Sequence, residues 1–196
     1  MSKGRESKPH IGIYGRRNNG KSSLINCLAG QDIAIVSDQA GTTTDPVKKS
    51  FEITGFGPVI LLDTAGIDDS GDLGLKRVER SIRTLEIIDL ALLLVAANSW
   101  GEYEDDLVRK FREHDIPFIV IHSKSDLEGP TSEFSHKVLA LSGSVLFEFS
   151  ALDKRNYEEL ISLIKSTIPE HSYKTPALLG DLKLRGYSST HNTDRC

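Results

Sequence analysis

The 196-residue chain contains 38% hydrophobic and 27% charged residues and carries a formal net charge of −4. This length supports one well-buried domain and is short for two. The 24 basic and 28 acidic residues leave no broad basic surface, which argues against nucleic acid or an anionic membrane as partner. Residues 1–10 lack the apolar segment of a secretory signal, and no apolar run has membrane-spanning length, so we expect a cytoplasmic protein.

Hydrophobic runs alternate between strand and helix patterns along the chain. A strand at residues 11–14 enters a glycine-containing loop, and a helix follows. After a polar stretch, two strands joined by a Gly-containing turn indicate a hairpin, and helices then alternate with buried strands. The expected elements after the first strand are helix 22–28, polar stretch 37–45, strands 47–53 and 58–62, helix 75–85, strand 90–96, helix 104–114, strand 118–121, a helical segment through Val138, strand 145–149 and helix 157–168.

This alternation predicts an α/β fold with a mostly parallel six-stranded sheet and helices on both faces. Such sheets bind ligands at the carboxyl ends of their strands. We expect residues 10–170 to form the domain, 1–9 a disordered extension, 171–182 a linker, and 183–196 a non-native or disordered tail. Two cysteines and six scattered histidines show no metal-ligand spacing, so we expect no protein-bound zinc or iron-sulfur cluster.

A complete phosphate-binding loop, Gly-Arg-Arg-Asn-Asn-Gly-Lys-Ser, lies at residues 15–22 between the first strand and helix. Its glycines let backbone N–H groups point at phosphates, Lys21 can reach the outer phosphates, and the Ser22 hydroxyl can bind Mg²⁺. The nucleotide-binding residues expected here are Gly15, Arg17, Asn18, Asn19, Gly20, Lys21, Ser22 and Ser23.

A second acidic motif, Asp63-Thr64-Ala65-Gly66, follows the apolar run at residues 59–62. Asp63 is expected to approach Mg²⁺ through a water, and the Gly66 N–H can sense the outer phosphate. Between the two motifs, the polar residues 41–45 can supply a threonine hydroxyl to the metal.

The choice of base depends on Ser123-Lys124-Ser125-Asp126, which follows the strand at 118–121. A fixed carboxylate at Asp126 accepts two hydrogen bonds from a guanine edge, and adenine cannot supply that pair. Ser150 and Ala151 end a later strand, where a backbone N–H can meet the guanine carbonyl. The five motifs together predict GTP or GDP as the ligand.

Residues 11–168 resemble the translation-factor class of GTPases, which is Ras-like in fold and belongs to the P-loop NTPases. Within it, Asn18 and the run Ile35-Val36-Ser37-Asp38-x-Ala40-Gly41-Thr42-Thr43 are similar to the TrmE, Era and EngA group. The resemblance implies that Thr43 binds Mg²⁺. It also suggests a K⁺ ion bound by Asn18 and by the loop residues Ser37, Gln39 and Thr42.

A narrower resemblance is to the FeFe-hydrogenase maturation GTPases, the HydF family. It is carried by Gly-Arg-Arg-Asn in the phosphate loop, by Thr42-Thr43-Thr44-Asp45-Pro46, and by Gly57-Pro58-Val59. It implies a role in assembling the diiron subcluster, with the radical-SAM maturases HydE and HydG, apo-hydrogenase and a second copy of the chain as partners. The family's clustered cysteine and histidine ligands are missing from this sequence, so no iron-sulfur cluster is expected.

Two positions depart from these families. Ser123 replaces the usual asparagine, so its contacts to base and phosphate loop are expected to be weaker, and Ile67 stands where Ras-like enzymes carry a water-orienting glutamine. The expected catalytic residues are Lys21, Thr43, Gly66 and Asn18, and an aspartate after Gly66 can position water. The candidates for that aspartate are Asp68, Asp69 and Asp72. We therefore expect slow GTP hydrolysis, stimulated by K⁺.

Three other functions stay open at this point. One is a ribosome- or tRNA-associated GTPase of the TrmE, Era and EngA group. Another is a regulatory module that binds nucleotide without hydrolysing it, because Ile67 has no polar atom. The third is an ATP-dependent kinase or transporter subunit, against which Asp126 argues.

Overall fold

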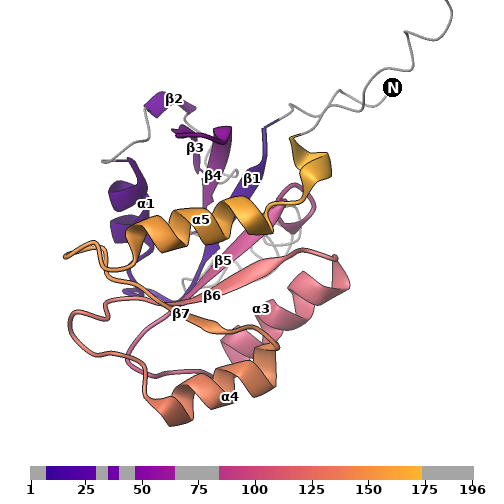
Figure 1. Ribbon diagram of the computed structural model, residues 1–196. Helices are drawn as coiled ribbons and strands as arrows, with labels where there is room; N and C mark the ends of the chain where they lie inside the picture. Colours follow the sequence, from indigo (N-terminus) through magenta and orange to yellow (C-terminus); the bar gives the residue numbers. More distant parts are fainter. Residues whose placement is uncertain (1–7, 30–34, 40–46, 65–83, 174–196) are drawn as a thin grey trace, which may run out of the picture.

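The computed structural model describes residues 8–29, 35–39, 47–64 and 84–173. Seven strands in these ranges form one sheet in the order β2-β3-β4-β1-β5-β6-β7 (Figure 1). The strands are β1 (His10–Tyr14), β2 (Ile35–Gln39), β3 (Val47–Ile53), β4 (Gly57–Asp63), β5 (Leu90–Val95), β6 (Phe118–His122) and β7 (Leu146–Glu148). β4, β1, β5, β6 and β7 are parallel, while β2 and β3 are antiparallel additions at one edge. The predicted α/β class and mostly parallel sheet are confirmed.

The sheet has one strand more than the six expected. The additional strand, β2, includes Ser37, Asp38 and Gln39, which were assigned to a polar stretch. It pairs antiparallel with β3 and has an irregular register between Ile35 and Ser37. An edge strand has only one neighbour and needs no continuous apolar pattern, so hydrophobic periodicity does not reveal it.

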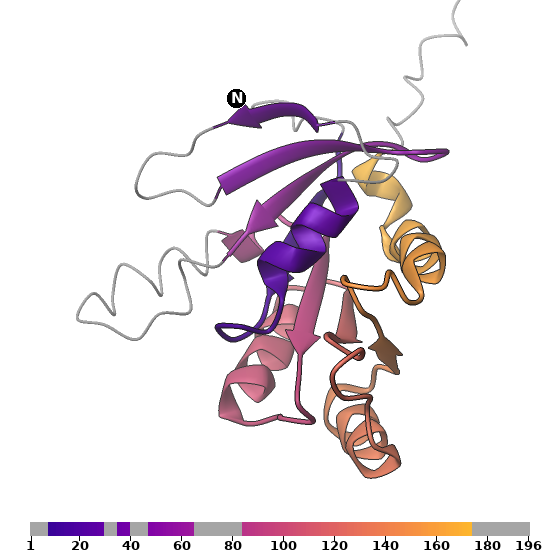
Figure 2. The ribbon, with the colours of Figure 1, turned by 90° about the vertical axis from the view of Figure 1, so that its left-hand side faces the viewer.

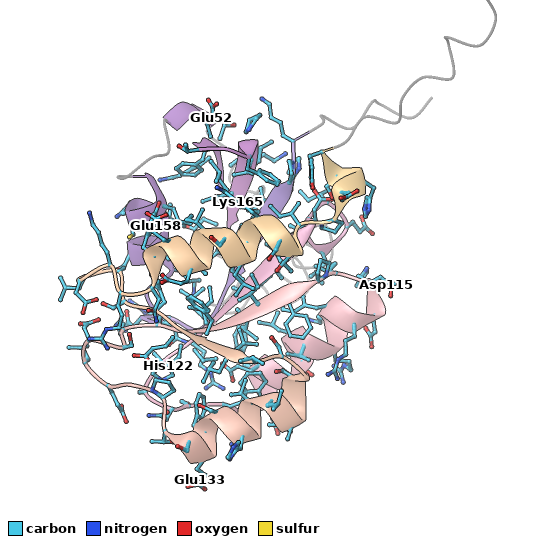
Figure 3. The ribbon with its side chains drawn as sticks, viewed as in Figure 1. Glu52, Asp115, His122, Glu133, Glu158 and Lys165 are labelled. Carbon is cyan, nitrogen blue, oxygen red and sulfur yellow. The ribbon has the colours of Figure 1, made fainter. Side chains whose placement is uncertain are left out.

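The predicted hairpin of β3 and β4 is confirmed, with pairs from Val47–Asp63 to Ile53–Gly57. At its turn the Phe56 N–H donates to the Ile53 carbonyl over 2.9 Å, and Gly55 adopts φ +75°, a left-handed conformation that glycine accepts readily. Lys165 of α5 (Tyr157–Thr167), labelled in Figure 3, donates to the Thr54 carbonyl over 2.7 Å. The turn is therefore attached to the helix beside it.

The helices lie on both faces of the sheet. α1 (Lys21–Ala29) and α5 pack on one face, and α3 (Glu102–Glu113) and α4 (Ser132–Ser142) pack on the other (Figure 2). A short 3₁₀ helix, η1 (Glu170–Ser172), follows α5. The helix expected at residues 75–85 lies outside the described residues, except for Thr84 and Leu85, which are helical.

β5 is buried along its whole length and divides the core into two halves. Leu90, Leu92 and Leu94 contact the cluster under α1 and α5, whereas Ala91, Leu93 and Val95 contact the cluster under α3 and α4. Successive side chains of a strand point to opposite faces, and a central parallel strand therefore reads as a continuous apolar run.

Within the described residues, no helix combines the length and the apolar character needed to cross a bilayer. The same residues contain no group of three histidine, cysteine, aspartate or glutamate side chains arranged to hold a metal ion. Of the expected extension at residues 1–9, residues 1–7 lie outside the described ranges, as does the tail from residue 183.

Candidate functional site

The predicted motifs meet at one edge of the sheet. The phosphate loop follows β1, Asp63 ends β4, the 123–126 segment follows β6, and Ser150 follows β7. The carboxyl ends of parallel strands lie together, and in Figure 1 the loops after β6 and β7 reach the side of the molecule where α1 begins. Residues far apart in the sequence are thereby brought to one site.

The backbone of the phosphate loop adopts conformations that explain its glycines. Gly15 has φ +144°, and a Cβ there would lie 2.6 Å from the Leu94 carbonyl oxygen, so any side chain would collide with β5. Gly20 has φ +84°, and Asn18 has φ +66°, a left-handed conformation that asparagine tolerates better than most residues. This sequence of conformations curls the loop around the start of α1.

Lys21 lies at the centre of this curl. Its side chain is 7% exposed, and its Nζ donates to the carbonyl oxygens of Gly15 and Arg16, the latter over 3.0 Å. The ammonium group is thus held over the loop, where it can meet an incoming phosphate.

A second set of bonds ties the loop to the neighbouring strands. Asn19 Nδ2 donates to the Leu94 carbonyl over 2.9 Å, and Ser123 Oγ donates to the Asn19 carbonyl over 2.6 Å. Ser123 is 4% exposed. Ser123 therefore does contact the phosphate loop, and the expectation that its contact is weaker than that of the usual asparagine stays a prediction.

A cavity of about 260 Å³ lies between the phosphate loop and the segments after β6 and β7. Its lining includes Gly20, Ser23, Lys124, Asp126 and Ala151, all predicted to bind nucleotide. Two exposed leucines, Leu127 and Leu152, complete the rim. An apolar slot with a carboxylate at one end fits a planar base that donates hydrogen bonds.

Ser150 has a function that the sequence did not indicate. Its backbone was expected to contact the base, but its hydroxyl donates to Asp126 Oδ1 over 2.6 Å and also accepts from the Leu152 N–H over 3.3 Å. The Ser150 side chain is fully buried. It therefore fixes the carboxylate while leaving Asp126 partly exposed to the cavity.

Two of the residues expected to bind Mg²⁺ are described, Ser22 in α1 and Asp63 at the end of β4. Ser22 is exposed in the first turn of α1, and Asp63 is paired in register with Ile13 of β1. Thr64 Oγ1 donates to the Ile13 carbonyl and so links the two strand ends. Oxygen donors of this kind suit Mg²⁺. Thr42, Thr43, Gly66 and the aspartates after it lie outside the described residues.

His122 is a buried polar residue directly before Ser123. Neither ring nitrogen has a hydrogen-bond partner among the described residues, and the ring packs edge-on against Phe134 at 5.9 Å between centroids. Figure 3 labels it near α4. Burial lowers the pKa of His122 below its ordinary value of about 6.5, and the carboxylates of Glu148 and Glu128 offset part of that change.

The curled loop offers a lysine and backbone N–H groups to phosphates, and the cavity beside it offers a carboxylate to a base. These two features define a guanine-nucleotide-binding P-loop protein. The chain belongs to the 50S ribosome-binding GTPase family, whose model matches residues 10–124. The predicted Ras-like P-loop fold and the GTPase activity are confirmed by this membership.

Two relatives of this chain are tRNA modification GTPases. The chain is 42% identical over 121 residues to the tRNA modification GTPase MnmE of Chromobacterium violaceum, covering 61% of this chain and 27% of the relative. It is 35% identical over 156 residues to MnmE of Nitrosomonas europaea, covering 79% and 34%. Thus it spans about a third or less of these relatives' length.

Among solved structures, a variant of Era from Aquifex aeolicus bound to GDP·AlF₄⁻ superposes with a TM-score of 0.65 at 30% identity. The match covers 82% of this chain and 57% of Era. The relatives named here are tRNA modification and Era GTPases, and the hydrogenase-maturation assignment stays a prediction.

Replacing Ser123 by alanine removes the bond to the phosphate loop. One hydrogen bond contributes about 1 kcal/mol, so we expect a fluorescent GDP analogue to dissociate about fivefold faster. Stopped-flow displacement measures this rate. Ser135→Ala, which removes a hydroxyl bond within α4, is the matched control. Dissociation from Ser123→Ala at the wild-type rate would contradict the assigned contact.

The His122 environment predicts a loss of stability in acid. Below about pH 6.5 the unfolded chain protonates this histidine while the folded chain, with its lowered pKa, does not, so the free energy of unfolding falls as pH decreases. For one histidine this slope cannot exceed about 1.4 kcal/mol per pH unit. Urea unfolding from pH 7.5 to 5 should show a smaller slope in His122→Leu. The exposed His136→Gln should keep the wild-type slope, and equal slopes in all three proteins would refute the prediction.

Proposed function

We propose that this chain is the GTP-hydrolysing switch domain of a longer tRNA-modification GTPase of the MnmE kind. The observation that carries the proposal is the 42% identity to a tRNA modification GTPase over 121 residues. The chain corresponds to about a quarter of that relative, so the modification chemistry belongs to the remainder of such a protein. GTP and GDP then act by changing the loops around the outer phosphate.

The proposed roles of the described residues follow from their positions. Lys21 and the loop backbone hold the phosphates, and Asp126, fixed by Ser150, reads guanine. Ser22 would bind Mg²⁺ directly and Asp63 would bind it through a water, together with Thr43, which lies outside the described residues. A bound Mg²⁺ would neutralise negative charge on the outer phosphates.

Hydrolysis is slow in this proposal because Ile67 offers no polar atom to the attacking water. An arginine finger is worth about 10³ to 10⁵ in rate, and a protein that lacks one works near the intrinsic rate of unassisted switches. Asn18, exposed in the phosphate loop, is available to bind a K⁺ ion in place of such a finger. Ser37 and Gln39, the other proposed K⁺ ligands, lie in β2, and Thr42 follows that strand in the sequence.

Hydrogenase maturation is the second candidate, and a specific sequence observation favours it. Gly-Arg-Arg-Asn at residues 15–18 and Thr-Thr-Thr-Asp-Pro at 42–46 are features of that family. In this role the domain would work with HydE, HydG and apo-hydrogenase. The two candidates share the GTPase chemistry and differ in what the switch controls.

A domain exchange separates the two candidates. This chain replaces the matching segment of Chromobacterium violaceum MnmE in cells that lack MnmE, and mass spectrometry measures modified nucleosides in tRNA. We expect modification to be restored, and a Lys21→Ala hybrid to fail. In the parallel exchange, the chain replaces the GTPase domain of a hydrogenase maturation factor. A hybrid that hydrolyses GTP and restores hydrogenase activity but not tRNA modification would overturn the main proposal.

The K⁺ hypothesis predicts faster hydrolysis in K⁺ than in Na⁺ at equal ionic strength, because an amide oxygen and backbone carbonyls can replace the hydration shell of K⁺. Phosphate release measures the rate. Asn18→Ala should remove the difference between the salts, while Asn26→Ala, an exposed asparagine on α1, should keep it. Equal wild-type rates in the two salts would end the hypothesis.

A further inference from the structure

Arg16, the second residue of the phosphate loop, points its charge at α3. Its guanidinium makes two bonds to Glu104 of α3, from Nε to Oε1 over 2.8 Å and from Nη2 to Oε2 over 2.7 Å. Both partners are planar, so this paired geometry is directional as well as strong. The hydrogen bond to Glu104 raises the pKa of Arg16 above its ordinary value.

Glu104 is held rigidly at the other end of this pair. Its side chain is fully buried, and Oε2 also accepts from the Gly101 N–H over 2.9 Å, which closes the first turn of α3. The guanidinium also lies 5.7 Å from the ring centre of Tyr103. A side chain at Gly101 would approach Arg16 Nη2 to 3.1 Å. Arg16 therefore lies against a fixed surface made by residues 101–104.

The first turn of α3 is itself anchored to the core. Trp100 is 8% exposed, and its Nε1 donates to Asp105 Oδ1 over 2.8 Å. Phe111, two turns further along α3, is completely buried and packs edge-on against Tyr14, directly before the phosphate loop. α3 is thus joined to the phosphate loop by the Arg16–Glu104 ion pair and, directly before the loop, by the packing of Phe111 against Tyr14.

We propose that Arg16 and Glu104 are positioning residues for nucleotide binding, which hold the first half of the phosphate loop in the curl that receives the β-phosphate. The Arg16 carbonyl accepts from Lys21 while its side chain is fixed to α3, so the pair sets the place of that carbonyl and of the lysine above it. If the ion pair is broken, the Glu104 carboxylate stays buried without its cation, which is unfavourable. We expect the phosphate loop to move so that this unfavourable free energy decreases.

The inference rests on the GTP-binding role of the loop and goes beyond it in assigning α3 a part in phosphate affinity. A neighbour of α3 that displaces Tyr103 or Arg16 would lower nucleotide affinity without touching the nucleotide. Coupling of this kind between two contacts is reciprocal, so bound nucleotide also stabilises the first turn of α3.

The test compares GDP with GMP, which lacks the β-phosphate, by calorimetry on the whole chain. Glu104→Gln keeps the size of the side chain and an oxygen for the Gly101 N–H but presents an amide N–H₂ to the guanidinium. Arg16→Lys keeps the charge but not the paired geometry. Each should weaken GDP binding about tenfold while changing GMP affinity by less than about twofold, and the double variant should lose no more than either single one.

Asp106→Asn is the matched control, because Asp106 pairs with Arg109 on the exposed side of the same helix. It should bind both nucleotides like the wild type. Because Arg16 is half-exposed, Arg16→Lys carries the test if Glu104→Gln does not fold. Unchanged GDP affinity, or equal losses for GDP and GMP, would overturn the inference. If the wild-type chain binds GDP but its hybrid with MnmE restores no tRNA modification, that result would count against the proposed function alone.

Discussion

The shape of the nucleotide site depends on hydrogen bonds that the carbonyl oxygens of the phosphate loop accept. A loop that offers its N–H groups to an anion must be held in shape by other atoms. Here Lys21 bonds the carbonyls of Gly15 and Arg16, and Ser123 bonds that of Asn19. The loop is thus supported from α1 and from the segment after β6. A change in either support alters how the phosphates are received, although Ser123 lies outside the loop itself.

The sequence predicted most of the fold because the central strands are buried on both faces. A continuous apolar run such as β5 indicates a strand that is buried on both faces, and the glycines of the phosphate loop indicate a tightly curled backbone. The boundaries of α1, α3 and α5 were predicted to within two residues. β2 was missed because a polar edge strand depends on its neighbour for pairing. Likewise, the Ser150 hydroxyl on Asp126 and the partner of Arg16 depend on tertiary contacts across 24 and 88 residues, which no local pattern encodes.

The base-reading segment combines strong and weak features. Asp126 is fixed by a buried hydroxyl, and Ser123 has a short bond to the phosphate loop. His122, between the sheet and this segment, has two ring nitrogens without partners among the described residues, and the Ser125 hydroxyl is in the same situation. Buried polar groups of this kind reduce stability, and proteins commonly retain them near functional sites. The segment that selects guanine therefore adjoins buried polar groups that lower the stability of the folded state.

The β3–β4 hairpin runs from the nucleotide-binding end of the sheet to its opposite end. Asp63 stands at the nucleotide end of β4, and Thr54 lies at the opposite end of the hairpin, about 20 Å away at 3.3 Å per residue. The two strands are paired along their full length, and Lys165 bonds the turn to α5. One continuous set of hydrogen bonds therefore joins the strand end at Asp63 to that helix.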